Sequence, residues 1–124
     1  MEDRIIFPGY IPDTDKAALL SGALGFVFPS LYEGFGFPVL EAQACGCPVV
    51  CSTTSSLPEI AGDGAILLNP EDIAGWARTM NRLASDPELR SGLIQRGRAN
   101  LSRFSWDKCA QVVIQTLEGL VAPP

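Results

Sequence analysis

Two glutamates bracket a glycine-rich turn within residues 29–50, PSLYEGFGFPVLEAQACGCPVV. Glu33 precedes the turn GFGF (residues 34–37), and Glu41 follows Pro38, with seven residues between the two acids. Glycines let a ligand approach the backbone closely. A helix that begins near Pro38 would point unpaired N–H groups and a partial positive charge at that ligand. This combination is typical of a phosphate-binding site.

The two acids have a chemical and a structural interpretation. Glu41 lies one turn inside the expected helix, where a carboxylate can accept hydrogen bonds from two neighbouring hydroxyls, and Glu33 lies at the carboxyl end of the preceding strand. Alternatively, both acids simply complement the dipole of a helix start, and the glycines only allow the turn. The residues alone leave both interpretations open.

Alternating strands and helices must position this segment. Short apolar runs predict buried strands at residues 4–7, 25–28, 48–51 and 65–68, with helices between and after them. This pattern predicts an α/β fold: a Rossmann-like, three-layer parallel sheet of about four strands with helices on both faces. Such sheets bind ligands at the carboxyl ends of their strands, where residues 29–38 are expected to lie.

The C-terminal third predicts helices only. Asn69 is expected to cap the first of them, with Pro70 at its first position. The last helix carries an apolar stripe that is expected to pack on the core, formed by Trp106, Ala110, Val113, Leu117 and Leu120. Four arginines are interpreted as a solvated face rather than a binding patch: Arg90, Arg96, Arg98 and Arg103.

Composition and charge narrow the function classes. The 124 residues, 47% hydrophobic and 19% charged, suit one globular domain over residues 1–124. The net charge of -5 argues against nucleic acid and against anionic membrane surfaces as main partners. No Lys or Arg occurs between Lys16 and Arg78. An anion in that stretch would therefore depend on backbone amides, a helix dipole or residues outside this chain.

Cysteines and the lack of histidine argue against a metal site. The four cysteines are Cys45, Cys47, Cys51 and Cys109, and their spacing matches no common zinc pattern. They are interpreted as small, mostly buried apolar residues of a reduced cytoplasmic protein. No metal ligand is assigned.

Read whole, the central segment resembles the signature of glycosyltransferase family 4. The resemblance rests on Pro29-Ser30, the run from Glu33 to Pro38, Leu40-Glu41-Ala42, and Gly46-x-Pro48-Val49-Val50. It extends over nearly the whole chain, through Gly9-Tyr10-Ile11-Pro12, Ser56-Leu57-Pro58-Glu59 and Phe104-Ser105-Trp106. That family has the two-domain GT-B fold and transfers sugars with retention at the anomeric carbon, and two glutamates at this spacing are its hallmark.

The resemblance implies a role for each matching residue. Glu41 would hold the ribose hydroxyls of a nucleotide sugar, and Glu33 would be the catalytic residue beside the reacting carbon. The donor would also contact residues of the turn and the helix start, namely Gly34, Phe35, Gly36, Phe37 and Val39. Its diphosphate would bind to the amides of Gly36, Phe37 and the residues that follow. Tyr10 and Ile11 would flank the base. No metal and no cofactor beyond the nucleotide-sugar donor is implied.

The resemblance also implies that this chain is only the C-terminal part of the donor-binding domain of a GT-B enzyme. The family's diphosphate-binding Arg and Lys, two βα units and the N-terminal acceptor domain would precede it. We therefore expect a fragment that is inactive alone, and either a rearranged four-stranded sheet or an oligomer through exposed sheet edges. The full-length enzyme would be cytoplasmic, with the inner face of the membrane as a possible location, and would serve polysaccharide biosynthesis.

Two alternatives belong to other classes. The chain could be a non-catalytic module that binds a nucleotide sugar or a partner domain. A nucleotide-sugar epimerase is disfavoured, because it does not account for the spacing from Glu33 to Glu41. The sequence does not identify the base, the sugar or the acceptor.

Overall fold

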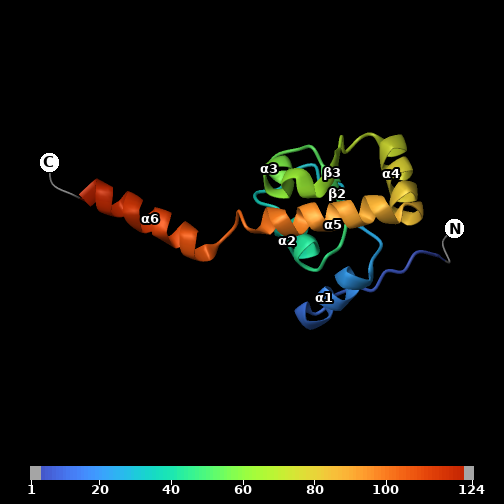
Figure 1. Ribbon diagram of the computed structural model, residues 1–124, viewed down its shortest axis with the longest axis horizontal. Coiled ribbons are helices and arrows are strands. Elements are labelled where there is room, and N and C mark those ends of the chain that lie inside the picture. The colour runs from blue at the N-terminus through green and yellow to red at the C-terminus, as the bar shows by residue number, and fades with distance from the viewer. Residues whose placement is uncertain (1–3, 122–124) are drawn as a thin grey trace.

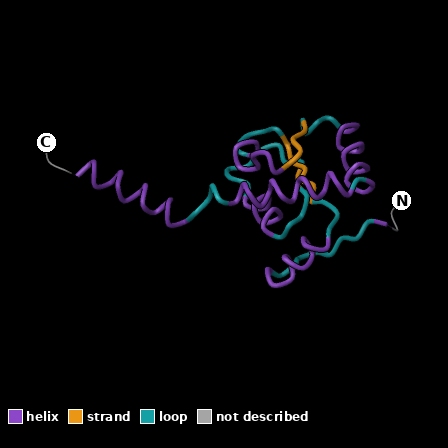
Figure 2. Tube along the Cα trace, viewed as in Figure 1, coloured by secondary structure: helices purple, strands orange, loops and turns teal. Residues whose placement is uncertain are grey.

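The computed structural model describes residues 4–121 and shows a small parallel sheet between helices (Figure 1). The strands, drawn in orange in Figure 2, are β1 (Phe26–Phe28), β2 (Val49–Ser52) and β3 (Ala65–Leu68). Their order in the sheet is β1-β2-β3. Both pairings are parallel, and Val50 lies opposite Val27 on one side and Ile66 on the other. All four residues of β2 are buried, so the central strand anchors the core.

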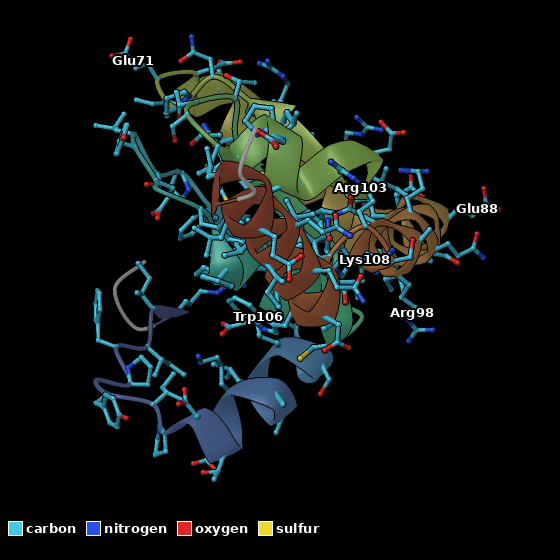
Figure 3. All side chains as sticks on the ribbon, turned by 90° about the vertical axis from the view of Figure 1, so that its left-hand side faces the viewer. Glu71, Glu88, Arg98, Arg103, Trp106 and Lys108 are labelled. Atoms are coloured by element: carbon cyan, nitrogen blue, oxygen red, sulfur yellow. The ribbon has the colours of Figure 1, made fainter. Side chains whose placement is uncertain are left out.

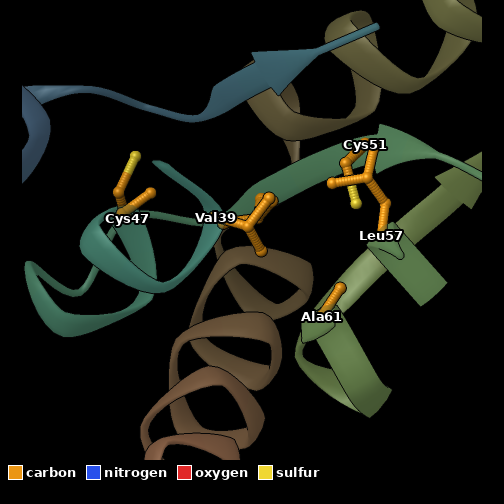
Figure 4. Close-up of a cluster of buried hydrophobic side chains, with 7 residues drawn as sticks. Val39, Cys47, Cys51, Leu57 and Ala61 are labelled. Atoms are coloured by element: carbon orange, nitrogen blue, oxygen red, sulfur yellow. The ribbon is translucent and has the colours of Figure 1, made fainter. Parts of the chain in front are cut away.

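Helices cover both faces of the sheet. On one face pack α1 (Asp13–Gly22), α2 (Phe37–Ala44) and α3 (Leu57–Ala61), which runs into the 3₁₀ turn η2 (Gly62–Gly64). The core of this face is a cluster of buried side chains, with Val39, Cys47, Cys51, Leu57 and Ala61 labelled in Figure 4. On the other face, α4 (Ile73–Ser85) and α5 (Pro87–Leu101) bury Trp76, Leu83 and Leu93 against Val50. The predicted fold class is confirmed.

Side-chain caps define where α4 and α5 begin. Asp72 accepts a hydrogen bond from the Gly75 amide at 2.9 Å, and Asp86 accepts one from the Leu89 amide at 2.9 Å. The prediction that Asn69 caps α4 is wrong. Its side chain instead accepts a hydrogen bond from the Glu71 amide and closes a turn before the helix.

The first of the four expected strands does not form. Residues 5–12 have no regular structure, and Ile6 and Phe7 are 85% and 89% exposed. A strand needs a neighbour for its hydrogen bonds, and among residues 4–121 no strand pairs with this segment. The sheet described therefore has three strands, and the outer edges of β1 and β3 remain open.

The last helix, α6 (Trp106–Val121), extends from the body as an arm (Figure 1). The prediction that its apolar stripe packs on the core is wrong, because Trp106 and Leu120 are each 77% exposed and Leu117 is exposed as well. An amphipathic helix buries its stripe only where another element faces it. Within the described part of the chain, only the first turns of α6 lie near the body, at α2.

Candidate functional site

The glycine turn delivers the start of α2 at the carboxyl end of β1. Gly36 adopts φ 110° and ψ 38° as the residue before the helix, a conformation that favours glycine. A Cβ there would lie 2.9 Å from Cδ2 of the buried Leu57 side chain, which would have to shift to admit it. The Gly36 carbonyl accepts the Val39 amide at 3.0 Å, and Pro38 has no N–H to donate.

Two serines of the loop between β2 and α3 hold the turn in place. The Glu33 amide donates to Ser55 Oγ at 2.9 Å, and Ser56 Oγ lies 3.0 Å from the Glu33 carbonyl and 2.7 Å from that of Phe35. Ser55 itself has φ 49°, in the left-handed region. These contacts tie down the loop carbonyls. The hydrogen bonds found across residues 4–121 include none donated by the amides of Gly36 or Phe37.

Sequence reasoning did not assign Ser55 and Ser56 a role. The available signal was the polar run from Ser52 to Ser56 directly after a buried strand, at the edge of the sheet where ligands bind. Their pairing with Glu33 depends on how two loops more than 20 residues apart meet, which spacing does not reveal.

Glu41 lies beside a cation that sequence reasoning also left out of the site. Lys16 Nζ on α1 lies 3.4 Å and 3.3 Å from the two carboxylate oxygens of Glu41 and 3.0 Å from Asp13 Oδ1. Hydrogen bonds to Asp13 and Glu41 raise the pKa of Lys16. The three side chains line a cavity of about 350 Å³ between α1 and α2.

Glu33 occupies different surroundings from Glu41. Its side chain is half-buried, and it lines neither the Glu41 cavity nor the two other surface cavities, of about 800 and 380 Å³, that flank α2 and α5. The structure therefore does not gather the two carboxylates in one of these cavities. The catalytic role of Glu33 stays a prediction.

The aromatic residues of the turn face the base of α6. The ring centroids of Phe35 and Phe37 lie 4.5 Å apart. Phe35 meets the edge of Phe104 at 6.3 Å, and Phe37 stacks on Trp106 at 6.3 Å. Both turn residues line the cavity of about 800 Å³, hereafter the aromatic groove.

Three further predicted positions lie apart from these cavities. The side chain of Val39 is fully buried in the core and its amide is engaged by Gly36, which leaves neither group free for a ligand. Tyr10 is 88% exposed and Ile11 is half-buried, both in the segment before α1. No cavity described above includes either residue.

A buried polar network fixes α2 behind the site. Gln43 on α2 donates to the Ala61 carbonyl at 3.0 Å and accepts from Asn100 Nδ2 of α5 at 2.9 Å. Asn100 also donates to the Ile60 carbonyl at 2.8 Å. Because both side chains are buried, these bonds set the position of α2 relative to α3 and α5.

Two of the four cysteines, Cys47 and Cys51, behave as core residues. Burial raises the pKa of the Cys51 thiol to about 11 and also raises that of Cys47. Within residues 4–121, no three His, Cys, Asp or Glu side chains gather as a metal site would require. None of the described helices has the length and apolar character needed to cross a bilayer.

Comparison with known proteins places the chain in a family. Residues 1–100 match the family described as "Glycosyl transferases group 1". Similar relatives include the O-antigen chain mannosyltransferase B of Escherichia coli, 42% identical over 91% of this chain, and a D-inositol 3-phosphate glycosyltransferase of Salinispora arenicola, 38% identical over 87%. The chain spans only 30% and 25% of these two proteins.

A solved structure gives the same result for the fold. Sucrose-phosphate synthase from Thermosynechococcus elongatus superposes with a TM-score of 0.82 at 33% sequence identity, over 95% of this chain and 30% of that one. This likeness supports the interpretation of the chain as the C-terminal portion of a GT-B fold. The chain belongs to the glycosyl transferases group 1 family.

Proposed function

We propose that this chain is the donor-nucleotide-binding portion of a retaining glycosyltransferase, and that it binds a nucleotide sugar at the start of α2. The observation that carries the proposal is the glycine turn held by Ser55 and Ser56, which leaves the Gly36 and Phe37 amides without acceptors in the described chain. Amides at a helix start favour a diphosphate through hydrogen bonds and the helix dipole.

The chemistry follows from the leaving group. When the bond between the sugar and the diphosphate breaks, negative charge develops on the diphosphate, and fixed N–H donors aimed at that charge lower the barrier. Glu41 accepts the ribose hydroxyls in this proposal, and Lys16 already holds its carboxylate on the side of the cavity between α1 and α2. Glu33 remains the candidate for contact with the transferred sugar.

For the donor we propose a nucleoside diphosphate that carries a hexose, with mannose as the first candidate. The support is the mannosyltransferase named among the relatives. Transfer needs an acceptor site as well, and the chain spans under a third of that relative. We therefore propose that this chain alone binds the donor without transferring sugar, and that transfer belongs to the longer protein with its acceptor domain.

Calorimetric titration of the chain with a panel of nucleoside diphosphates tests the proposal. We expect one member to bind, and Glu41→Ala to weaken it by roughly 1–3 kcal/mol, the value of hydrogen bonds to a charged group. Glu71→Ala is the control, because Glu71 (labelled in Figure 3) is an exposed residue in the turn before α4 and lines none of the three cavities described above. Binding that Glu41→Ala leaves unchanged would contradict the assigned role of Glu41.

A further inference from the structure

The aromatic groove is the largest of the three cavities described above, and no ligand has been assigned to it. Rings wall it on both sides, from Phe35 and Phe37 at the start of α2 to Phe104 and Trp106 at the base of α6. Leu40, Val112 and Val113 extend its apolar lining. Its volume of about 800 Å³ falls within the roughly 300–1,000 Å³ of small-molecule sites.

The only charges that line the aromatic groove, among the described residues, are positive. Arg103 and Lys108 contribute to its wall, and no carboxylate does. Figure 3 labels both, together with Trp106, where α6 leaves the body. This is unexpected in a protein of net charge -5.

The two cations are also available to an anion. Arg103 Nη1 donates to the Glu59 carbonyl at 3.1 Å and to Asn100 Oδ1 at 2.8 Å, which holds the guanidinium without neutralising it. Its carbon lies 5.3 Å from the Phe104 ring centroid, at the wall of the groove. Lys108 takes part in none of the ion pairs found between described residues.

We propose that the aromatic groove binds one molecule of a phosphorylated lipid. The hydrocarbon chain lies against Phe37, Trp106 and Val113, and the phosphate is held by Arg103 and Lys108. Guanidinium and ammonium groups together suit a phosphate, and the burial of hydrocarbon against aromatic rings supplies the larger share of the affinity.

A single molecule fits better than a bilayer surface. The net charge of -5 opposes attraction to an anionic membrane, whereas a concave groove with two local cations selects one anionic head and one chain. The proposal rests on different residues from the ribose assignment, because neither Glu41 nor Glu33 lines this groove. Phe37 belongs to both sites, since its amide is offered to the diphosphate and its ring lines the groove.

Tetradecyl phosphate, used below its micellar concentration, is the probe. The chain has two tryptophans, and Trp76 is buried on α4, so the Trp76→Phe variant leaves Trp106 as the reporter. Far-UV circular dichroism checks that this variant is folded. We expect a blue shift of the Trp106 emission on binding, and about tenfold weaker binding of tetradecyl maltoside, which has the same tail and no charge.

Two pairs of variants test the geometry. Val113 lines the groove and its neighbour Ile114 does not, although both are exposed on α6. We expect Val113→Asp to weaken binding of the phosphate probe at least tenfold and Ile114→Asp less than twofold. Lys108→Gln should weaken binding of the phosphate probe roughly three- to tenfold. Arg82→Gln, at an exposed position of α4 outside the groove, should leave that binding unchanged.

Several results would overturn the proposal. These are the absence of binding, equal affinity for the phosphate and the maltoside, or equal effects of Val113→Asp and Ile114→Asp. If the chain binds anionic vesicles and Val113→Asp does not alter that binding, Arg103 and Lys108 would serve a membrane surface instead of a single lipid. Displacement of the probe by a nucleoside diphosphate would make the groove part of the donor site. A titration of the Val113→Asp variant with nucleoside diphosphates tests the proposed function separately. The proposed function predicts that this variant binds the nucleoside diphosphate as tightly as the native chain does.

Discussion

Cys51 shows how burial alone determines the chemistry of one side chain. It lies in the centre of β2, fully buried, and its thiol is held protonated with a pKa of about 11. Burial also raises the pKa of the Cys47 thiol, whereas Cys109 is exposed on α6. The cysteines were predicted to be small core residues, and this is confirmed for two of the four.

The raised pKa of Cys51 makes stability depend on alkaline pH. The unfolded thiol loses its proton near pH 9.0, while the folded thiol keeps it until about pH 11. Between these values the folded state binds more protons, so its free energy of unfolding falls as the pH rises. Urea titrations at pH 8.5 and 10.5 should show this fall in the native chain and a smaller one in Cys51→Ala. Identical changes in both proteins would assign the effect to other groups.

At the scale of elements, the start of α2 rests on Gly36 rather than on Gly34. Gly36 has positive φ, and a Cβ there would push against the buried Leu57 side chain, whereas a Cβ on Gly34 would meet nothing within 4 Å. We expect Gly36→Ala to lower the free energy of unfolding by roughly 1–3 kcal/mol. Gly34→Ala should change it by less than about 0.5 kcal/mol.

Thermal and chemical unfolding of the two alanine variants check this contrast, and nucleotide titration separates structure from binding. If Gly34 allows close approach of the donor, Gly34→Ala weakens nucleotide binding in a protein of native stability. A Gly36→Ala variant as stable as the native chain would show that the turn can be rebuilt without positive φ.

The elements that the sequence predicts correctly are those that local signals define. Local signals define the start of α2, through the glycine turn and Pro38. They also define three strands, through the apolar runs at 25–28, 48–51 and 65–68. The segment at 4–7 has equally apolar residues and forms no strand, because a strand depends on a neighbour. The stripe of α6 is present in the sequence, but its packing depends on a facing surface.

Contacts within the site were harder to predict than its position. The contact between Lys16 and Glu41 joins α1 to α2 across 25 residues, and Ser55 reaches Glu33 from another loop. Both depend on how the elements pack, which no local pattern encodes. Val39 was predicted as a ligand contact from its position in the motif that resembles the family's signature. In the structure its side chain belongs to the core.

At the scale of the whole molecule, exposed apolar surface should drive association. The outer edges of β1 and β3 are open, and α6 exposes Leu117 and Leu120 beyond the aromatic groove. We expect sedimentation velocity to show mass that increases with protein concentration. A monomer across the micromolar range would contradict this, and would show that polar residues around these surfaces suffice to keep the chain apart.

The central claim is that a diphosphate binds to the amides at the start of α2. The most direct test is an amide proton–nitrogen NMR titration with the nucleoside diphosphate that calorimetry selects. We predict that the largest shifts occur at Gly34, Gly36 and Phe37, with smaller ones at Glu41, and that Glu41→Ala reduces them all. Shifts that gather on α4 or α5 while those turn amides stay unchanged would contradict the account.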